Sequence, residues 1–295
     1  MLRVRRLTRS YGDSTVLDDV SFEVRPGRIT GFVGANGAGK TTTMRIILGV
    51  LAPDSGTVEW DGSPLTPELR RRFGYMPEER GLYPKMKVRD QLVFFGRLHG
   101  YGKEAAAERA RHLLHRLGLA ERADDVLETL SLGNQQRVQI AAALMHEPVA
   151  LVLDEPFSGL DPHAVDSMVQ LLRDEVTTEV PVLFSSHQLD LVERLCDDLV
   201  ILSRGRLVAA GPVEALRRQE RPRYRVVLAD DADAAWLRDL PELVVTDVDG
   251  PRALVELAGT ESPSTLLKRI VDRARVEEFA PDVRSLSEIF KEVTR

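Results

Sequence analysis

Apolar residues in the first 220 positions fall into short runs separated by polar turns, and most of these runs have the length of a strand. Residues 149–153 are apolar without interruption, which is typical of a strand buried on both faces of a parallel sheet. The pattern therefore predicts an α/β fold. The predicted strands are residues 2–7, 16–24, 28–33, 56–62, 72–77, 149–153, 180–184, 198–202 and 206–210.

From about residue 85 to residue 147 the apolar residues recur with helical spacing instead. Leu113, Leu114 and Leu117, for example, fall on one face of a helix. This change predicts a helical insertion between strands, with its last helix opening at Ser131, a good N-cap residue. A capping role alone is the alternative to any binding role for Ser131.

The segment between the strand predicted at 28–33 and a helix predicted from residue 43 is rich in glycine. Glycines at 34, 37 and 39 allow backbone angles at which successive N–H groups converge on one anion. Lys40 adds a positive charge for the outer phosphates of a nucleotide, and Thr41 offers a hydroxyl to its Mg²⁺. The predicted phosphate cradle is Gly34-Ala35-Asn36-Gly37-Ala38-Gly39-Lys40-Thr41-Thr42. A glycine-rich turn that merely contains a lysine is the alternative, and the flanking strand and helix argue against it.

Two adjacent carboxylates, Asp154 and Glu155, follow the apolar strand at 149–153. Ligands bind at the carboxyl ends of strands in open α/β folds, and paired acids at that place need a cation beside them. We predict that Asp154 holds Mg²⁺, directly or through water, and that Glu155 orients or deprotonates an attacking water. A pair of helix-capping acids is the weaker alternative, because Pro156 follows at once.

Two other residues are candidates for contacts with a nucleotide. His187 is the one histidine directly after an apolar strand, so we place it beside the terminal phosphate. Tyr11 lies in a polar turn predicted at residues 10–13, where its ring could stack on a purine base. An ordinary loop tyrosine is the alternative, and the nearby phosphate cradle favours stacking.

The composition is that of a soluble globular protein, with 43% hydrophobic and 29% charged residues in a chain of 295. A net charge of −6 without a long basic run makes nucleic acid an unlikely partner. Apolar runs fall far short of the ~20 residues that cross a bilayer. The first residues lack the apolar region of a signal peptide, and Cys196 is the single cysteine. We therefore expect a cytoplasmic protein without a disulfide.

The last third of the chain reads as a second, smaller domain. A helix predicted at 213–219 leads to a boundary at 220–222. Beyond it the elements predicted at 224–228, 232–237, 243–248, 253–257, 264–271 and 276–280 follow the order β, α, β, β, α, β, with a final helix at 286–293. This order matches the ferredoxin-like arrangement. No phosphate, metal or nucleophile motif occurs in this part, which suggests a structural or dimerisation module.

The motifs occur in the order found in ATP-binding-cassette (ABC) ATPases: the cradle, residues 130–135, 151–155, 158–161 and His187. Over residues 1 to about 218 the chain resembles the nucleotide-binding subunit of a bacterial transporter. The run at 75–83 and the tail are most similar to subunits of sodium or drug exporters. The resemblance implies a P-loop NTPase fold with a RecA-like core, an antiparallel β subdomain and a helical subdomain (residues 1–219), followed by a small α+β ferredoxin-like domain (222–295).

The same resemblance implies an ATPase that uses ATP and Mg²⁺ and drives an exporter whose membrane-spanning permease is a separate chain. It works as a homodimer, or with a close homologue, on the inner face of the cell membrane. The resemblance assigns contacts with ATP to Ser131, Gly133, Gln135 and Asp161, with Ser131 and Gly133 completing the site of the partner chain.

Two departures from the family pattern stand out. The usual signature Leu-Ser-Gly-Gly-Gln is replaced by Leu130-Ser131-Leu132-Gly133-Asn134, which keeps the serine and the second glycine. Glu78 replaces the usual glutamine in the loop after residue 76, and its carboxylate is still a suitable ligand for Mg²⁺. A soluble ABC-type ATPase that acts as a regulatory clamp without a transporter is the alternative function. A subunit that binds nucleotide without hydrolysis is disfavoured, because Lys40, Asp154, Glu155 and His187 are all present.

Overall fold

The computed structural model of the protein describes residues 1–79, 81–175, 179–217, 222–229, 232–257, 262–282 and 285–293. It divides into two compact units, of which the first is Met1–Val213 with Phe290–Arg295 and the second is Glu214–Ile289. Parts of three predicted segments lie outside the described residues: Arg80 in the run at 75–83, residues 218–219 at the end of the predicted helix, and residues 220–221 at the predicted boundary.

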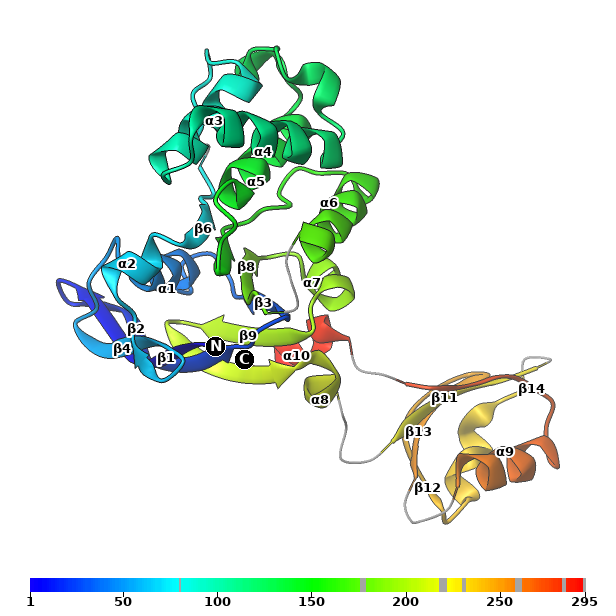
Figure 1. Ribbon diagram of the computed structural model, residues 1–295. Coiled ribbons are helices and arrows are strands. Elements are labelled where there is room, and N and C mark those ends of the chain that lie inside the picture. The colour runs from blue at the N-terminus through cyan, green and yellow to red at the C-terminus, as the bar shows by residue number, and fades with distance from the viewer. Residues whose placement is uncertain are drawn as a thin grey trace. The chain divides into compact units, whose positions relative to one another are not determined.

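A four-stranded antiparallel sheet in the order β2-β1-β4-β5 forms one part of the first unit (Figure 1). Its strands are β1 (Leu2–Tyr11), β2 (Ser14–Val24), β4 (Ser55–Trp60) and β5 (Ser63–Pro64). The predicted strand at 2–7 was too short: β1 continues to Tyr11, because Ser10 pairs with Thr15 and Tyr11 with Ser14. The turn is therefore Gly12 and Asp13, and Tyr11 ends a strand instead of lying in a loop.

A six-stranded sheet in the order β10-β9-β3-β8-β7-β6 forms the centre of this unit. All its neighbours are parallel except β9 and β10, which pair as the predicted antiparallel hairpin. In this sheet β8 lies between β3, which precedes the cradle, and β7, so β3 and β7 are separated by one strand. The strands are β3 (Ile29–Val33), β6 (Phe73–Met76), β7 (Ala150–Leu153), β8 (Val182–Ser186), β9 (Asp198–Ser203) and β10 (Arg206–Pro212).

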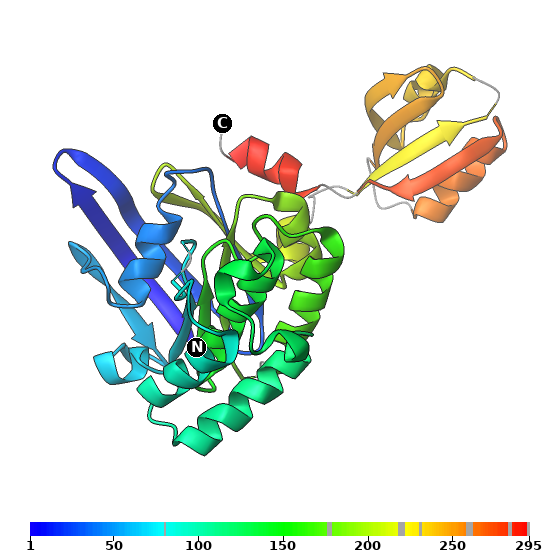
Figure 2. The same cartoon turned by 90° about the horizontal axis from the view of Figure 1, so that it is seen from above.

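Helices of the predicted insertion gather at one end of the first unit, away from the antiparallel sheet (Figures 1 and 2). They are α3 (Val88–Leu98), α4 (Lys103–Arg116) and α5 (Leu132–Leu144), with short 3₁₀ turns η1 (Ala120–Arg122) and η2 (Leu127–Thr129) between α4 and α5. The insertion is thus confirmed as helical. Ser131 is the N-cap of α5, and its Oγ accepts a hydrogen bond from Asn134 N at 3.4 Å.

Four other helices of the first unit follow or precede strands of the central sheet. They are α1 (Lys40–Ile47), α2 (Pro67–Arg70), α6 (Pro162–Glu175) and α7 (Leu189–Leu195). Of these, α6 and α7 connect strands of the central sheet directly, whereas α1 and α2 lie between the central and the antiparallel sheet in the sequence. The prediction did not include α6, although Asp161 followed by Pro162 is a typical helix start. Asp161 caps this helix, since its Oδ1 accepts a hydrogen bond from Ala164 N at 3.0 Å.

The second unit contains a four-stranded antiparallel sheet in the order β12-β13-β11-β14. Numbered within the unit, this order is 2-3-1-4, which is the ferredoxin-like order and confirms the prediction. Its first helical segment is a 3₁₀ helix and not an α-helix. The elements of the C-terminal part of the chain are α8 (Val213–Arg217), β11 (Arg223–Leu228), η3 (Ala234–Asp239), β12 (Leu243–Asp249), β13 (Arg252–Leu257), α9 (Pro263–Val271), β14 (Val276–Pro281) and α10 (Leu286–Val293).

Separate apolar clusters support the two units. Phe32, Met44 and Val152 are fully buried in the first cluster, where they join β3, α1 and β7. Val255 and Ile270 are fully buried in the second cluster, which joins β13 and α9. Because β3 and β7 share a buried core, the residues that follow these two strands are held at one edge of the sheet.

Candidate nucleotide site

The cradle follows β3 as predicted, and its last three residues are the first turn of α1, which begins at Lys40 and not at the predicted residue 43. Gly34 must be glycine, because a Cβ at this position would lie 2.6 Å from the carbonyl oxygen of Leu202. Gly39 has a φ of +102°, and a Cβ there would lie 2.5 Å from Cδ2 of Leu17. Both glycines therefore allow the loop to pass close to neighbouring strands, and Gly39 also adopts a backbone angle that other residues avoid.

Lys40 is nearly buried, at 8% exposure, and its Nζ donates to the carbonyl oxygens of Gly34 at 2.6 Å and Ala35 at 3.3 Å. The ammonium group is thus held over the cradle itself. These two carbonyl groups satisfy part of its hydrogen-bonding capacity, and a phosphate oxygen would satisfy more. The cradle is therefore preorganised around a positive charge.

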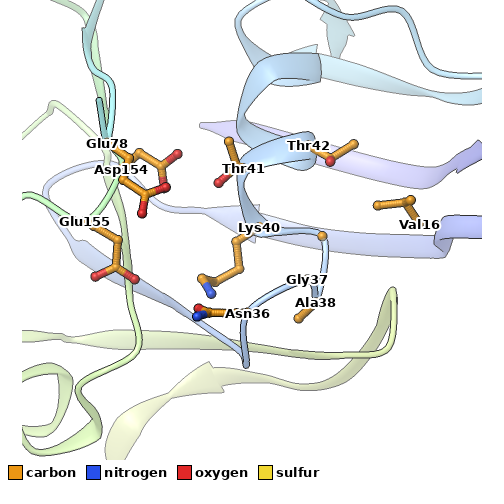
Figure 3. A pocket seen from close by; sticks show the side chains of 11 residues that line it. Val16, Asn36, Gly37, Ala38, Lys40, Thr41, Thr42, Glu78, Asp154 and Glu155 are labelled. Atoms are coloured by element: carbon orange, nitrogen blue, oxygen red, sulfur yellow. The ribbon is translucent and has the colours of Figure 1, made fainter. Parts of the chain in front are cut away.

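The cradle and the acids after β7 line one cavity of about 260 Å³ (Figure 3). Figure 3 shows the carboxylates of Glu78 and Asp154 on the side of the cavity that faces the hydroxyl of Thr41. The lining residues are Val16, Asn36, Gly37, Ala38, Gly39, Lys40, Thr41, Thr42, Glu78, Asp154 and Glu155. The three residues predicted to hold Mg²⁺, Thr41, Glu78 and Asp154, are among them.

Asp154 is almost fully buried, and only one of its two carboxylate oxygens accepts a hydrogen bond from the described residues. Its Oδ1 accepts a hydrogen bond of 2.6 Å from Ser185 Oγ, whereas its Oδ2 is buried and has no hydrogen-bond partner among the described residues. An unpaired buried carboxylate oxygen is costly unless a cation or a donor reaches it. Together with the Thr41 hydroxyl in the same cavity, this oxygen fits a Mg²⁺ ion, which binds hard oxygen ligands.

Glu155 combines an unusual backbone with a perturbed side chain. Its φ is +49°, in the left-handed region that non-glycine residues seldom adopt. The backbone N of Glu155 donates a hydrogen bond of 2.8 Å to Ser185 Oγ. Oε2 of the Glu155 side chain lies 3.0 Å from Nδ1 of His187. Burial raises the pKa of the Glu155 carboxyl, and the hydrogen bond and charge of His187 act in the opposite direction.

Ser185 is a site residue that the sequence analysis did not predict. It ends the apolar stretch of β8, and its hydroxyl joins Asp154 and Glu155 of the neighbouring strand by donating to one and accepting from the other. The only signal in the sequence was its place at a strand end, just before His187. Val16 lines the cavity as well, and no motif pointed to it.

The remaining predicted residues do not line this cavity. The side chain of Gln135 is buried and donates to Leu130 O at 2.8 Å. Ser131 and Asp161 cap helices of their own chain, and the capping bond lowers the pKa of Asp161. Tyr11 is half exposed, with the guanidinium of Arg9 stacked 4.9 Å from its ring centre. Contacts of Tyr11, Ser131, Gly133, Gln135 and Asp161 with ATP stay predictions.

No helix among the described residues is long and apolar enough to cross a membrane. Residues 17–158 match the family of ABC transporters, and residues 211–294 match the C-terminal domain of DrrA1-3-like ATP-binding proteins.

The chain is 35% identical over 292 residues to an ABC transporter ATP-binding protein of Bacillus subtilis, covering 99% of this chain and 98% of that protein. It is 38% identical over 214 residues to the Nod factor export ATP-binding protein I of Cupriavidus metallidurans, covering 72% of this chain and 71% of that protein. A solved ATP-binding subunit of an ABC transporter superposes with a TM-score of 0.67 at 35% identity, covering 74% of this chain and 92% of the other.

Proposed function

Because this chain belongs to the ATP-binding proteins of ABC transporters, we propose that it hydrolyses ATP as a dimer and thereby drives export through a separate membrane-spanning chain. The resemblance inferred from the order of the motifs, and the P-loop fold with its antiparallel and helical parts, are both confirmed. Members of this family bind ATP and are ATPases. The direction of transport, the use of Mg²⁺ and the roles of single residues are parts of the proposal.

The observation that carries the proposal is the meeting of the cradle with Asp154 and Glu155 in one cavity. Backbone N–H groups of the cradle and the start of α1 would hold the phosphates of ATP. Lys40 would turn its ammonium from the Gly34 and Ala35 carbonyls toward the outer phosphates. Catalysis of phosphoryl transfer depends mainly on positioning the phosphates and neutralising their negative charge, and the cradle would contribute to both.

Thr41 Oγ1 and Asp154 Oδ2 are the groups that would hold Mg²⁺, with Glu78 as a further oxygen ligand. When bound, Mg²⁺ neutralises charge on the phosphate oxygens. Ser185 holds the other oxygen of Asp154 and so fixes which oxygen faces the cavity. Since the carboxylate cannot rotate without losing this 2.6 Å bond, the site is oriented in advance.

Glu155 is the group that would accept the proton of the attacking water. Its raised pKa makes it a stronger base than an ordinary carboxylate, because its charge is less stabilised by solvent. His187 would orient the carboxylate through Oε2 and lie close to the terminal phosphate. Ser185 holds the backbone N of Glu155, so the base is fixed at both its main chain and its side chain.

The second half of each ATP site is proposed to come from a partner chain. Ser131 and Gly133 lie at the start of α5 and do not line the cavity that holds Lys40 and Glu155. A two-fold axis would present the same patch of each chain to the other and create two equivalent sites. A homodimer, or a dimer with a close homologue, would then close on ATP and reopen after hydrolysis.

Mixing two defective variants tests this arrangement. Lys40→Ala and Ser131→Ala should each fail to trap ATP as a homodimer. If sites are shared, a mixed dimer places both defects in one site and leaves the other intact, so trapping returns on mixing. The matched control mixes the Lys40→Ala chain with a double variant that carries both Lys40→Ala and Glu155→Gln. Both chains then lack Lys40, so no intact site can form. A mixture of the first pair that traps no more ATP than the control would end the shared-site proposal.

Export and location at the membrane are supported by the relatives. The Nod factor export protein is an ATP-binding protein named for export, and the C-terminal part matches a domain of ATP-binding proteins. We place the chain in the cytoplasm, on the inner face of the cell membrane and bound to a permease. Fractionation of cells checks this: the chain should sediment with membranes when the permease is present and stay in the supernatant when it is deleted. Equal sedimentation in both strains would contradict the proposal.

The two domains are proposed to be residues 1–219 and 222–295. Separate apolar clusters support independent folding of the larger domain. Residues 1–219 should therefore unfold in one cooperative transition and still bind ATP. A chain cut at residue 219 that unfolds without cooperativity would show that the tail belongs to the same folding unit.

A further inference from the structure

Two leucines and two glycines fit together where the start of α5 meets the loop after β7. A Cβ on Gly159 would lie 2.8 Å from Cδ2 of Leu132, and a Cβ on Gly133 would lie 3.1 Å from Cδ2 of Leu160. Each leucine thus occupies the space that the glycine of the other segment leaves open. We call this set of four residues the leucine–glycine interlock. Leu132 is still 41% exposed, so the contact lies at the surface and outside the core.

The interlock is connected to Glu155 by a short segment of chain with backbone hydrogen bonds of its own. Ser158 N donates to Glu155 O at 3.2 Å, and Leu160 N donates to Phe157 O at 3.2 Å, so two successive turns run from Glu155 to Leu160. The ring of Phe157 packs edge-on against Phe184 of β8, with 5.3 Å between ring centres. A shift of Gly159 or Leu160 would therefore reach the backbone of Glu155, whose φ of +49° is already strained.

On the other side, the interlock includes residues that the proposed dimer presents to the partner's ATP. Leu132 is the first residue of α5, directly after its N-cap Ser131. Gly133 follows and is itself part of the interlock. In the proposed dimer Ser131 and Gly133 serve the partner's ATP, whereas Glu155 serves the ATP in its own cavity. The interlock thus joins groups that act on two different ATP molecules.

Leu132 also marks a difference between this chain and the usual signature, which has glycine at that position. Glycine has no side chain that could reach Gly159, so the closer of the two approaches depends on the leucine. A leucine that is 41% exposed contributes little to the core, so packing alone is a poor explanation for it. A role in transmitting movement between two segments fits its position better.

We propose that Leu132 is a positioning residue, which couples ATP at the partner-facing segment to the alignment of Glu155 in the same chain. The inference rests on the proposed function. When the partner's ATP fixes Ser131 and Gly133, the interlock holds the loop at Gly159 and Leu160, and the loop holds Glu155. Each ATP then favours hydrolysis of the other, which makes turnover cooperative in ATP.

The first test replaces Leu132 and measures ATPase rate against ATP concentration. Leu132→Ala should lower kcat about two- to thirtyfold, the range seen for residues that carry coupling, and should bring the Hill coefficient close to 1. Leu132→Met keeps an apolar side chain of similar length, so its kcat and Hill coefficient should stay close to those of the wild-type chain. Leu98→Ala is the matched control, because Leu98 is a leucine with 66% exposure on α3. Unchanged kcat and Hill coefficient in Leu132→Ala would overturn the inference.

The second test is a double-mutant cycle between Leu132 and Gly159. Gly159→Ala places a methyl group against Cδ2 of Leu132 at a φ of +73°, so it should lower kcat strongly in the wild-type background. In the Leu132→Ala background the clash is gone and only the backbone cost is left, so the further fall in kcat should be smaller. Equal falls in the two backgrounds would show that the two residues act independently and would overturn the inference.

These outcomes separate the inference from the function on which it rests. If the wild-type chain has no ATPase activity, the proposed function fails. If it has activity, and Leu132→Ala lowers only the melting temperature while kcat and the Hill coefficient stay the same, the contact is structural and the inference alone fails.

Discussion

The proposed ATP site has two halves, and a single chain brings together the residues of only one of them in a cavity. The cradle half, residues 36–42 with Glu78, Asp154 and Glu155, lines one cavity. The signature half, Ser131, Gly133, Gln135 and Asp161, lies outside that cavity, and three of its side chains make hydrogen bonds within their own chain.

The two halves also differ in the state of their polar groups. In the cradle half Asp154 Oδ2 is buried with no hydrogen-bond partner in the part of the chain that the structure describes, and Glu155 combines a strained φ with a raised pKa. Such costs persist where a ligand or a reaction requires them. In the signature half the side chains of Ser131, Gln135 and Asp161 each make a hydrogen bond within their own chain, and Ser131 and Asp161 are exposed, which suits a surface that is presented to another molecule. The first half therefore needs a ligand, and the second half needs a partner.

The largest effect is expected from Glu155→Gln. The amide fits the same space and can still contact His187, but it cannot accept a proton from water. Turnover should fall about 10² to 10⁴-fold while ATP binding is retained. ATPase rate and equilibrium binding of ATP check the two parts, with the exposed Glu121→Gln as control. A kcat equal to that of the wild-type chain would remove Glu155 from the catalytic role.

Lys40→Ala should instead weaken ATP binding itself. Hydrogen bonds to charged groups contribute roughly 1.5–3 kcal/mol, so the dissociation constant should rise about ten- to a hundredfold. Titration with ATP measures the effect, and Lys103→Ala at the exposed start of α4 is the matched control. Equal affinity in Lys40→Ala would contradict the assignment of residues 34–42 as the phosphate cradle.

His187→Gln should move the pH dependence of turnover. Glu155 is active as a base only when deprotonated, and burial raises its pKa, so activity is lost as pH falls through this raised value. His187 lowers that pKa, and removing it should raise the pKa further and shift the acid limb of the pH–rate profile to higher pH. The exposed His115→Gln is the control. An acid limb that stays in place or moves to lower pH would argue against this contact.

The smallest effect is expected from Glu78→Gln, which sharpens the definition of the cradle half. The change is nearly isosteric and removes one negative charge from the cavity wall. If Glu78 contacts Mg²⁺, the ion concentration that gives half-maximal ATPase rate should rise a few-fold, about the cost of one surface ion pair. Glu79→Gln, at the exposed neighbouring position, should leave the Mg²⁺ dependence unchanged. Identical curves for Glu78→Gln and the wild-type chain would mean that Glu78 faces away from the ion.

Much of the fold was predictable because its signals are local. The strand–cradle–helix segment at residues 28–48, the N-cap at Ser131 and the element order of the second unit each depend on residues a few positions apart. The order of the motifs in the chain was also enough to indicate the family. The prediction missed the end of β1 at Tyr11 and the 3₁₀ form of η3, whose local signals are weak, and it did not include α6 although Asp161 and Pro162 mark its start.

Contacts between distant residues were decided only by the tertiary structure. Ser185 joins Asp154 and Glu155 because β7 and β8 are neighbours in the sheet, and a pattern within one strand does not specify which strand lies beside it. The same holds for Leu132 and Gly159, which are distant in sequence and fit together through shape alone. The sequence by itself determined which residues could do chemistry, since chemistry depends on residue type and local backbone. The packing of strands and loops decided which of them meet, since that depends on register and on the space each side chain leaves.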